Sequence, residues 1–401
     1  MVLLTMRDEN RLKVIETVMD GRISIEEASN LLGIKERQVF RLLARVRKKG
    51  GSGIVHGNKR NQHACKWREE EKKKLLDLVK EKYGGVNDTQ MREYLEDQEG
   101  IVIGRESLRK ILRESGHKPK IKRRSRRYRV QRERKEAFGK MIQIDASIHD
   151  WLEGRGSRMS LVGGIDDATG YVWGLFEKSE NTWGYFRLVE KIVLSEGIPL
   201  SLYSDRHTIF HSPKEPTVIE QIQNTRSLTQ FGRAMKEMGI EMIKAYSPQA
   251  KGRIERLWRT FQDRLVVEMR MAGISDREQA NVFLKGFLER YNKRFCKSPK
   301  TRVAVFRKRP CLYELQRTLC YKEIRTVNRD HTISFEGFKL QIPPNKRWAS
   351  IAGQKVTVLQ LEDKSLEVFY KGMQVLIRSA QQLQNLVKYY ETKLKQLDPA
   401  A

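Results

Sequence analysis

The sequence predicts a chain of several domains that is helical at its N-terminal end, α/β in its middle and strand-rich towards its C-terminal end. Three observations predict this order. Apolar residues recur at helical spacing up to residue 115, short apolar runs alternate with helical segments over residues 137–297, and short alternating strands follow from residue 298. The length of 401 residues is sufficient for about two to four domains.

The chain is strongly basic. It has 79 Lys and Arg residues against 50 Asp and Glu residues, a formal net charge of +29, and 39% hydrophobic residues, which is enough for packed cores. A well-solvated surface or a ribosome-associated protein is one interpretation of this charge. Because Lys and Arg that neutralise phosphates release condensed counterions, we favour a polyanionic partner. The charge alone does not distinguish DNA from RNA.

The four cysteines, Cys65, Cys296, Cys311 and Cys320, form no CxxC pair, and their spacing fits neither a zinc site nor a disulfide framework. We expect free thiols in a reducing cytosol. The sequence has no signal-peptide pattern and no apolar stretch of about 18 residues. We therefore expect a soluble cytoplasmic protein without a membrane partner, associated with the nucleoid when it binds DNA.

Residues 1–50 have the pattern of a helix-turn-helix domain. A periodic helix covers 11–19, Ser24 and Glu27 form a capping box for a short helix ending at Leu32, and a third helix begins near Lys35. The residues expected to face inward are Leu12, Ile15, Val18, Met19, Ala28, Leu31, Leu32, Val39, Leu42, Leu43 and Val46. The residues expected to contact DNA in a major groove are Lys35, Arg37, Gln38 and Arg41. The alternative is a three-helix module that binds protein.

Residues 51–65 are expected to be a glycine-rich linker without a packed element. A second helical, winged-helix-like DNA-binding domain is expected over 66–115, with helices over 70–82, from an Asp88 cap, and over 106–115. Its last helix would turn Leu108, Ile111 and Leu112 inward and present Arg105 and Arg109 to DNA. A purely structural spacer would show the same apolar pattern.

Residues 116–136 form a basic linker in which the only acidic residues are Glu133 and Glu136. Like charges at this density repel and resist compaction. We expect this linker to follow DNA and to become ordered on binding, whereas a solvated tether is the alternative. Its cations are Lys118, Lys120, Lys122, Arg123, Arg124, Arg126, Arg127, Arg129, Arg132, Arg134 and Lys135.

Three carboxylates mark the middle of the chain. Two apolar runs end in Asp145 and Asp205, and a loop that opens a helix carries Glu255 on the first turns of that helix, at spacings of 60 and 50 residues. A carboxylate at the end of a buried strand is costly unless its charge is balanced, although one such residue is often a satisfied structural aspartate. Three together suggest Mg²⁺ or Mn²⁺, which take oxygen ligands and in pairs suit in-line displacement at phosphorus.

Four motifs extend this pattern over about a third of the chain: QIDA at 143–146, IDDATG at 165–170, YSD at 203–205 and SPQAKGRIER at 247–256. In this order the sequence resembles the integrase core of DDE transposases, a ribonuclease-H-like fold, and is most similar to the ISNCY family of bacterial insertion-sequence transposases. The resemblance implies that Asp145, Asp205 and Glu255 form the D-D-E triad and hold two Mg²⁺ or Mn²⁺ ions. The gap from Asp205 to Glu255 is longer than in retroviral integrases, and we interpret the excess as an inserted loop at about 206–225.

The resemblance also implies an activity. A DNA transposase of this kind binds terminal inverted repeats, hydrolyses a phosphodiester at the element's end and joins the resulting 3′-hydroxyl to target DNA. Because two ends must be joined, we expect a homodimer or a higher oligomer on DNA. Lys251, Arg253 and Arg256 are expected substrate contacts, with plain surface charge as the alternative. A DNA-binding regulator without catalysis and a ribonuclease-H-like nuclease without strand transfer are the other functions that the sequence allows.

The predicted core covers 137–297 and ends in a trailing helix. Its strands are expected over 141–146, 159–165 and 171–176, then ending at Asp205, then over 241–245, with helices over 182–195, 227–238 and 251–271. Three antiparallel strands followed by alternating strands and helices are typical of an α/β ribonuclease-H-like core. Asp166 and Asp167 are interpreted as turn residues. Residues 298–377 are expected to form a small β-barrel and 378–401 a helix or tail.

Overall fold

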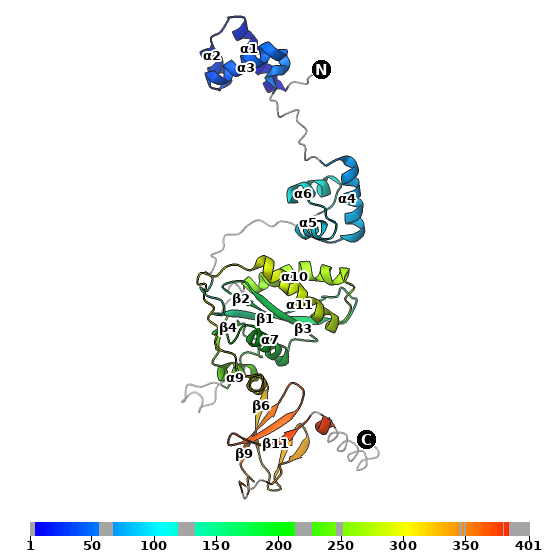
Figure 1. Ribbon diagram of the computed structural model, residues 1–401, viewed down its shortest axis with the longest axis vertical. Helices are drawn as coiled ribbons and strands as arrows, with labels where there is room; N and C mark the ends of the chain where they lie inside the picture. The colour runs from blue at the N-terminus through cyan, green and yellow to red at the C-terminus, as the bar shows by residue number, and fades with distance from the viewer. Residues whose placement is uncertain are drawn as a thin grey trace. The chain divides into compact units, whose positions relative to one another are not determined.

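The chain forms two compact units, Met1–Gly84 and Gly85–Ala401, in the computed structural model shown in Figure 1. Each unit is described here by itself. The structure describes residues 5–55, 67–118, 133–212, 227–245, 252–344, 347–348, 350–379 and 381–384.

The first unit opens with three helices, α1 (Met6–Met19), α2 (Ile25–Leu32) and α3 (Glu36–Lys49). The predicted capping box is confirmed, because Ser24 Oγ accepts from Glu27 N and Glu27 Oε2 accepts from Ser24 N. The four inward residues predicted on α3 are buried around Ile15 and Ala28. Two inward predictions are wrong, since Met19 is 43% exposed and Leu31 is 68% exposed. Both lie in the last turn of a helix, where the chain leaves the core.

The prediction that residues from 51 onwards form a linker without a packed element is also wrong at its start. Residues Gly50–Ile54 form a 3-10 helix, η1, whose Ile54 is buried in the same core as Val39 and Leu42. Glycine is required at position 53, because a Cβ there would lie 2.3 Å from the carbonyl oxygen of Arg45. The glycines therefore permit a tight return onto α3 instead of an open linker. The helix α4 (Glu69–Lys82) also belongs to this unit.

The second unit opens with α5 (Asp88–Asp97) and α6 (Arg105–Glu114). Asn87, and not the expected Asp88, caps α5 by accepting from the backbone N–H groups of Thr89 and Gln90. Leu108, Ile111 and Leu112 are buried as predicted.

A five-stranded mixed sheet forms the centre of the second unit, in the order β3-β2-β1-β4-β5. Its strands are β1 (Ile142–His149), β2 (Met159–Asp166), β3 (Val172–Glu177), β4 (Ser201–Ser204) and β5 (Glu241–Lys244). Strands β1, β2 and β3 pair antiparallel, while β4 pairs parallel to both β1 and β5. The predicted order of elements in this α/β core is confirmed.

Helices cover both faces of this sheet (Figure 1). One face packs on α7 (Thr182–Ser195) and α9 (Gln230–Glu237), and the other on α10 (Gly252–Met271) and α11 (Arg277–Phe295). Alternate strand residues separate the two cores, with Val162 in the first and Leu161 in the second.

The segment after α11 packs on the core, although the predicted boundary lies at residue 297. Ile198 and Arg307 exchange two backbone hydrogen bonds of 2.8 and 3.0 Å, and Phe306 packs against the first apolar core. The helix α12 (Leu312–Thr318) adds Leu315 to the same core. These contacts continue the α/β core beyond the residues that the sequence pattern assigned to it.

The last part of the second unit is strand-rich, as predicted. Strands β6 (Tyr321–Thr326), β9 (Lys355–Gln360), β10 (Leu366–Tyr370) and β11 (Met373–Arg378) form one sheet, and β7 (Thr332–Phe335) pairs with β8 (Phe338–Gln341). The two turns predicted at 336–337 and 371–372 have positive φ at both residues, which is typical of type I′ hairpins. The described strands form two sheets around one core. No pairing among these described strands closes the sheets into the predicted barrel.

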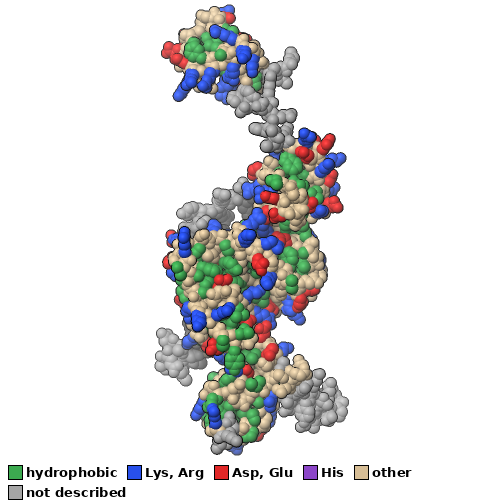
Figure 2. Space-filling model, in the orientation of Figure 1, with side chains coloured by type: hydrophobic (Ala, Val, Ile, Leu, Met, Phe, Trp, Pro, Cys, Tyr) green, Lys and Arg blue, Asp and Glu red, His purple; other side chains and the backbone are tan. Residues whose placement is uncertain are grey.

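Among the described residues, no helix is long and apolar enough to cross a membrane. Figure 2 shows Lys and Arg side chains distributed over the described parts of the visible face, with Asp and Glu between them.

Candidate active site

Asp145 lies in β1, and Asp205 directly follows the neighbouring parallel strand β4. The register pairs Gln143 of β1 with Tyr203 of β4, and each aspartate lies two residues further along its own strand direction. Because side chains two residues apart in a strand share a face, Asp145 lies on the same face as Gln143, and Asp205 follows β4 at the same level of the sheet. Both residues are half-buried.

The charges of both carboxylates act on a buried tyrosine. Tyr185 of α7 donates from its hydroxyl to Glu180 Oε1 at 2.6 Å. Burial raises the pKa of Tyr185 well above its ordinary value, and the negative charges of Glu180, Asp145 and Asp205 raise it further. Both aspartates thus act on one hydroxyl. Sequence reasoning missed Tyr185, because nothing in its local pattern distinguishes it from an ordinary core residue of an amphipathic helix.

Glu255 lies on the first turn of α10 and its side chain is exposed. One turn later, Trp258 Nε1 donates to Asp145 Oδ2 at 3.1 Å, so the start of α10 lies against β1 at the first carboxylate. Gly163, the partner of Asp145 on β2, leaves room for this indole, since a Cβ there would lie 2.6 Å from the Trp258 ring. A side chain larger than hydrogen at position 163 would therefore displace Trp258.

A buried polar network fixes the first turn of α10 to the sheet. Asp167 Oδ1 accepts from Arg253 Nε at 2.7 Å and from Gln143 Nε2 at 2.9 Å, and the Ile254 N–H approaches Gln143 Oε1 at 3.4 Å. The side chain of Asp167 is fully buried and that of Arg253 is 13% exposed. This network holds the helix that carries Glu255 beside the strand that carries Asp145.

The two adjacent aspartates of the β2–β3 turn therefore have different roles. Asp166 Oδ1 accepts from the backbone of Ala168 and Thr169 and from the Thr169 hydroxyl, which agrees with the turn interpretation. Burial raises the pKa of Asp166, and these hydrogen bonds oppose the increase. Asp167 instead pairs across 86 residues with Arg253, an interaction that no local pattern predicts.

The expected DNA contacts lie in several places. Lys35, which precedes α3, and Arg37, Gln38 and Arg41 of α3 are exposed. Arg105 and Arg109 are exposed on α6 within 3.9 Å of Glu106. Arg256 is exposed beside Glu255, whereas Arg253 is held by Asp167. The remaining expected contacts, Arg123, Arg124, Arg126, Arg127 and Lys251, lie outside the described residues.

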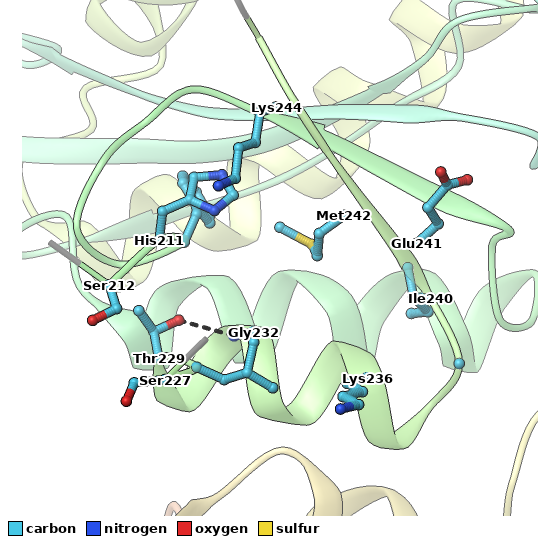
Figure 3. Close-up of a pocket in the computed structure, with 13 residues that line it drawn as sticks. His211, Ser212, Ser227, Thr229, Gly232, Lys236, Ile240, Glu241, Met242 and Lys244 are labelled. Atoms are coloured by element: carbon cyan, nitrogen blue, oxygen red, sulfur yellow. Dashed lines mark hydrogen bonds between the residues drawn. The ribbon is translucent and has the colours of Figure 1, made fainter. Parts of the chain in front are cut away.

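A cavity of about 470 Å³ lies between α9 and β5 on the Asp205 side of the sheet (Figure 3). Its labelled residues include His211 and Lys244, and Lys244 pairs with Ser204, the residue before Asp205. Burial and then Lys244 lower the pKa of His211, while the charge of Asp205 opposes this. The described walls end at Ser212 and Ser227, so we assign this cavity no role.

The donor chemistry of the site fits a hard divalent cation. Asp145 and Asp205 offer carboxylate oxygens, the ligands that Mg²⁺ and Mn²⁺ prefer. Among the described residues, no group of three or more His, Cys, Asp or Glu side chains converges closely enough to hold a metal ion.

A mixed sheet with one aspartate inside β1 and another directly after the neighbouring parallel strand β4, followed by a helix with a glutamate, defines an α/β core of the integrase kind. Two relatives are similar in sequence to most of the chain. The candidate transposase y4bF of Sinorhizobium fredii is 35% identical over 377 residues, covering 93% of this chain and 80% of the relative. The transposase for insertion sequence IS1202 of Streptococcus pneumoniae is 30% identical, covering 82% of this chain and 77% of the relative.

The chain belongs to the insertion-sequence transposases, and it is a DNA transposase of the DDE type. Neither relative's name carries the narrower ISNCY label. No protein-family model matches the chain.

Solved structures of retroviral integrase cores are also similar to the chain. The HTLV-2 integrase catalytic core in complex with magnesium is 16% identical, covering 41% of this chain and 94% of that one at a TM-score of 0.30. The BIV integrase catalytic core is 18% identical, covering 36% and 79% at a TM-score of 0.25.

Proposed function

We propose that this transposase cuts DNA at the ends of its element and joins them to a target, with Asp145, Asp205 and Glu255 as the catalytic carboxylates. The observation that supports this best is the alignment of Asp145 and Asp205 on adjacent parallel strands, with Trp258 of the Glu255 helix bonded to Asp145. Glu255 completes the triad when its carboxylate turns towards the aspartates, one turn of helix from Trp258.

Each carboxylate has a defined task in this proposal. A pair of Mg²⁺ or Mn²⁺ ions bound there would activate the attacking oxygen and stabilise the leaving oxygen of an in-line displacement. Asp145 and Asp205 hold the ions from the sheet, and Trp258 keeps Asp145 in one orientation. The Asp167–Arg253 pair keeps the first turn of α10 in place, so Glu255 has only its own side chain to move.

DNA recognition is proposed to use the N-terminal helices and the basic linker. The exposed residues of α3, Lys35, Arg37, Gln38 and Arg41, are types that read base edges and phosphates, as in helix-turn-helix proteins. Arg105 and Arg109 of α6 form a second contact with the terminal repeat. Phosphates of the bound strand would meet the linker cations over 116–136 and Arg256. Because two element ends are joined, the active species is at least a dimer.

The test is cleavage of a labelled duplex that carries the terminal repeat, with Mg²⁺ or Mn²⁺ present. We expect Asp145→Ala, Asp205→Ala and Glu255→Gln to lose nicking and strand transfer while they retain DNA binding. Asp150→Asn is the matched control, because Asp150 directly follows β1 at the end away from the site and caps only its own turn, through Gly154 N. It should cleave like the wild type.

Three outcomes would contradict parts of this proposal. Nicking that survives Glu255→Gln would mean that another residue is the third carboxylate. If the wild type binds DNA but does not nick it with either metal, the protein would be a DNA-binding regulator without catalysis. Nicking without joined products would indicate a nuclease on the same core.

A further inference from the structure

We infer that a groove beside the start of α10 binds the phosphodiester backbone of the DNA strand entering the active site. It has a volume of about 510 Å³ and is lined by Glu133, Arg134, Ile165, Gly170, Arg253, Arg256 and Lys297. We call it the basic groove. The inference rests on the proposed function, because it places substrate DNA at the carboxylates, but it concerns binding and is testable without catalysis.

The basic groove joins three parts of the chain that are far apart in sequence. Arg134 lies near the end of the basic linker, Arg256 comes from the first turns of α10, and Lys297 comes just after α11. Two hydrogen bonds keep these parts together at the β2–β3 turn. Arg134 Nη1 donates to the carbonyl oxygen of Ala168 at 2.9 Å, and Lys297 N donates to that of Thr169 at 2.9 Å.

The charge of the groove remains positive after its ion pairs are counted. Arg253 is neutralised by Asp167 at 2.7 Å, and Glu133 is paired with Lys300 at 3.6 Å. Arg134, Arg256 and Lys297 have no carboxylate partner among the described residues. Three cations that line one groove without a carboxylate partner raise the local positive potential, and an anion bound among them would lower their mutual repulsion. A phosphodiester is the anion that a transposase encounters.

The position of the groove fits a strand that leads into the site. Ile165, which lines the groove, is paired with Gln143, two residues from Asp145 on β1. Arg256 directly follows Glu255. A phosphate in the groove would therefore lie next to the catalytic carboxylates without contacting them. Because all three cations would contact phosphate and not base edges, they would not distinguish one base sequence from another.

The test compares the wild type with Arg134→Gln, Arg256→Gln, Lys297→Gln and the triple variant. Each full-length protein is titrated with a fluorescent duplex in metal-free buffer at several salt concentrations. For every cation that no longer neutralises a phosphate, the slope of log K against log salt should become shallower by about 0.9, and the affinity near 0.1 M salt should fall roughly five- to tenfold. The decrease should be equal for terminal-repeat and unrelated duplexes.

A second triple variant controls for net charge. Lys285, Lys308 and Lys364 are exposed in the same unit and do not line the groove. Changing them to Gln should leave the slope as in the wild type.

The inference is overturned if the groove variants keep the wild-type slope, or if the control triple lowers it as much. Arg256→Gln and Lys297→Gln alter exposed side chains, so they decide the question even if the Arg134 variant fails to fold. If the wild type never cleaves DNA but the slope becomes shallower only in the groove variants, the groove is supported and the proposed catalysis is contradicted. If the wild type cleaves DNA and the groove variants keep the wild-type slope, the catalysis is supported and the groove is contradicted.

Discussion

The indole Nε1 of Trp258 donates a hydrogen bond of 3.1 Å to Oδ2 of Asp145. Trp258 is 7% exposed and lies one turn after Glu255, so a single buried side chain connects the helix of one catalytic carboxylate to the strand of another. A hydrogen bond to a charged acceptor contributes about 1.5–3 kcal/mol, which is enough to fix the carboxylate in one rotamer.

Trp258→Phe should therefore lower cleavage about tenfold and raise the Mg²⁺ concentration needed for half-maximal rate. The phenyl ring retains most of the packing, while Asp145 loses the donor that orients it. The measurement is the nicking rate across a Mg²⁺ titration. Trp173→Phe is the control, since its Nε1 donates to Ser195 Oγ at 3.2 Å and not to a carboxylate of the site. Equal Mg²⁺ requirements in the two variants would show that Trp258 acts through packing alone.

The neighbouring aspartates of the β2–β3 turn allow the positioning of α10 to be tested by itself. Asp167→Asn weakens a pair in which one side chain is fully buried and the other 13% exposed, and the protein should be destabilised by about 3–5 kcal/mol. Asp166→Asn also destabilises, through the turn and through the Gly139 N–H that Asp166 Oδ2 accepts at 3.0 Å, neither of which involves α10. Hydrogen exchange should distinguish them, with faster exchange at the first turn of α10 in Asp167→Asn only. The same exchange pattern in both variants would contradict a positioning role for Asp167.

Two asparagines of α11 protect the edge of the central sheet. Asn292 accepts from Val172 N and donates to Val172 O, each at 2.9 Å, and Asn281 does the same at Phe176 at 2.8 and 3.0 Å. Because β3 is an edge strand, these amides replace the missing neighbour strand.

Asn292→Ala should leave a buried N–H and a buried C=O of Val172 without their partner, and should destabilise the protein by about 2–5 kcal/mol. The measurement is the midpoint of urea unfolding, with light scattering to detect association through the exposed edge. Asn281 is only half-buried, so water can replace its amide and Asn281→Ala should cost less. A larger destabilisation by Asn281→Ala than by Asn292→Ala would contradict this account.

Local sequence signals predicted much of the fold. The capping box at Ser24, the hairpin turns at 336–337 and 371–372 and the core strands all depend on residues within a few positions of one another. The features that were missed depend on distant contacts. Asp167 meets Arg253 across 86 residues, Asn292 meets Val172 across 120, and Ile54 packs on α3 because Gly53 permits close approach. For the same reason, the motifs identified candidate carboxylates, whereas the hydrogen bond from Trp258 to Asp145 required the folded chain.

The described cysteines are free thiols, as predicted, and they should differ in reactivity. Burial raises the pKa of Cys320 from 9.0 to about 11, and burial followed by the charge of Asp166 raises that of Cys296 to about 11. Cys311 is exposed. Because the thiolate is the reactive form, about one thousandth of Cys320 or Cys296 is reactive at about pH 8 in the folded protein.

Iodoacetamide at that pH should therefore modify Cys311 before Cys296 and Cys320, and mass spectrometry of digested protein should find Cys296 and Cys320 modified only after unfolding. Since folding raises these two pKa values, the folded protein retains protons that the unfolded chain loses above about pH 9. Their contribution to stability is complete below that pH and is lost as the pH rises through about 11. The Cys296→Ala and Cys320→Ala variants should show a smaller decrease in stability over this interval than the wild type, and an unchanged decrease would contradict the assignment.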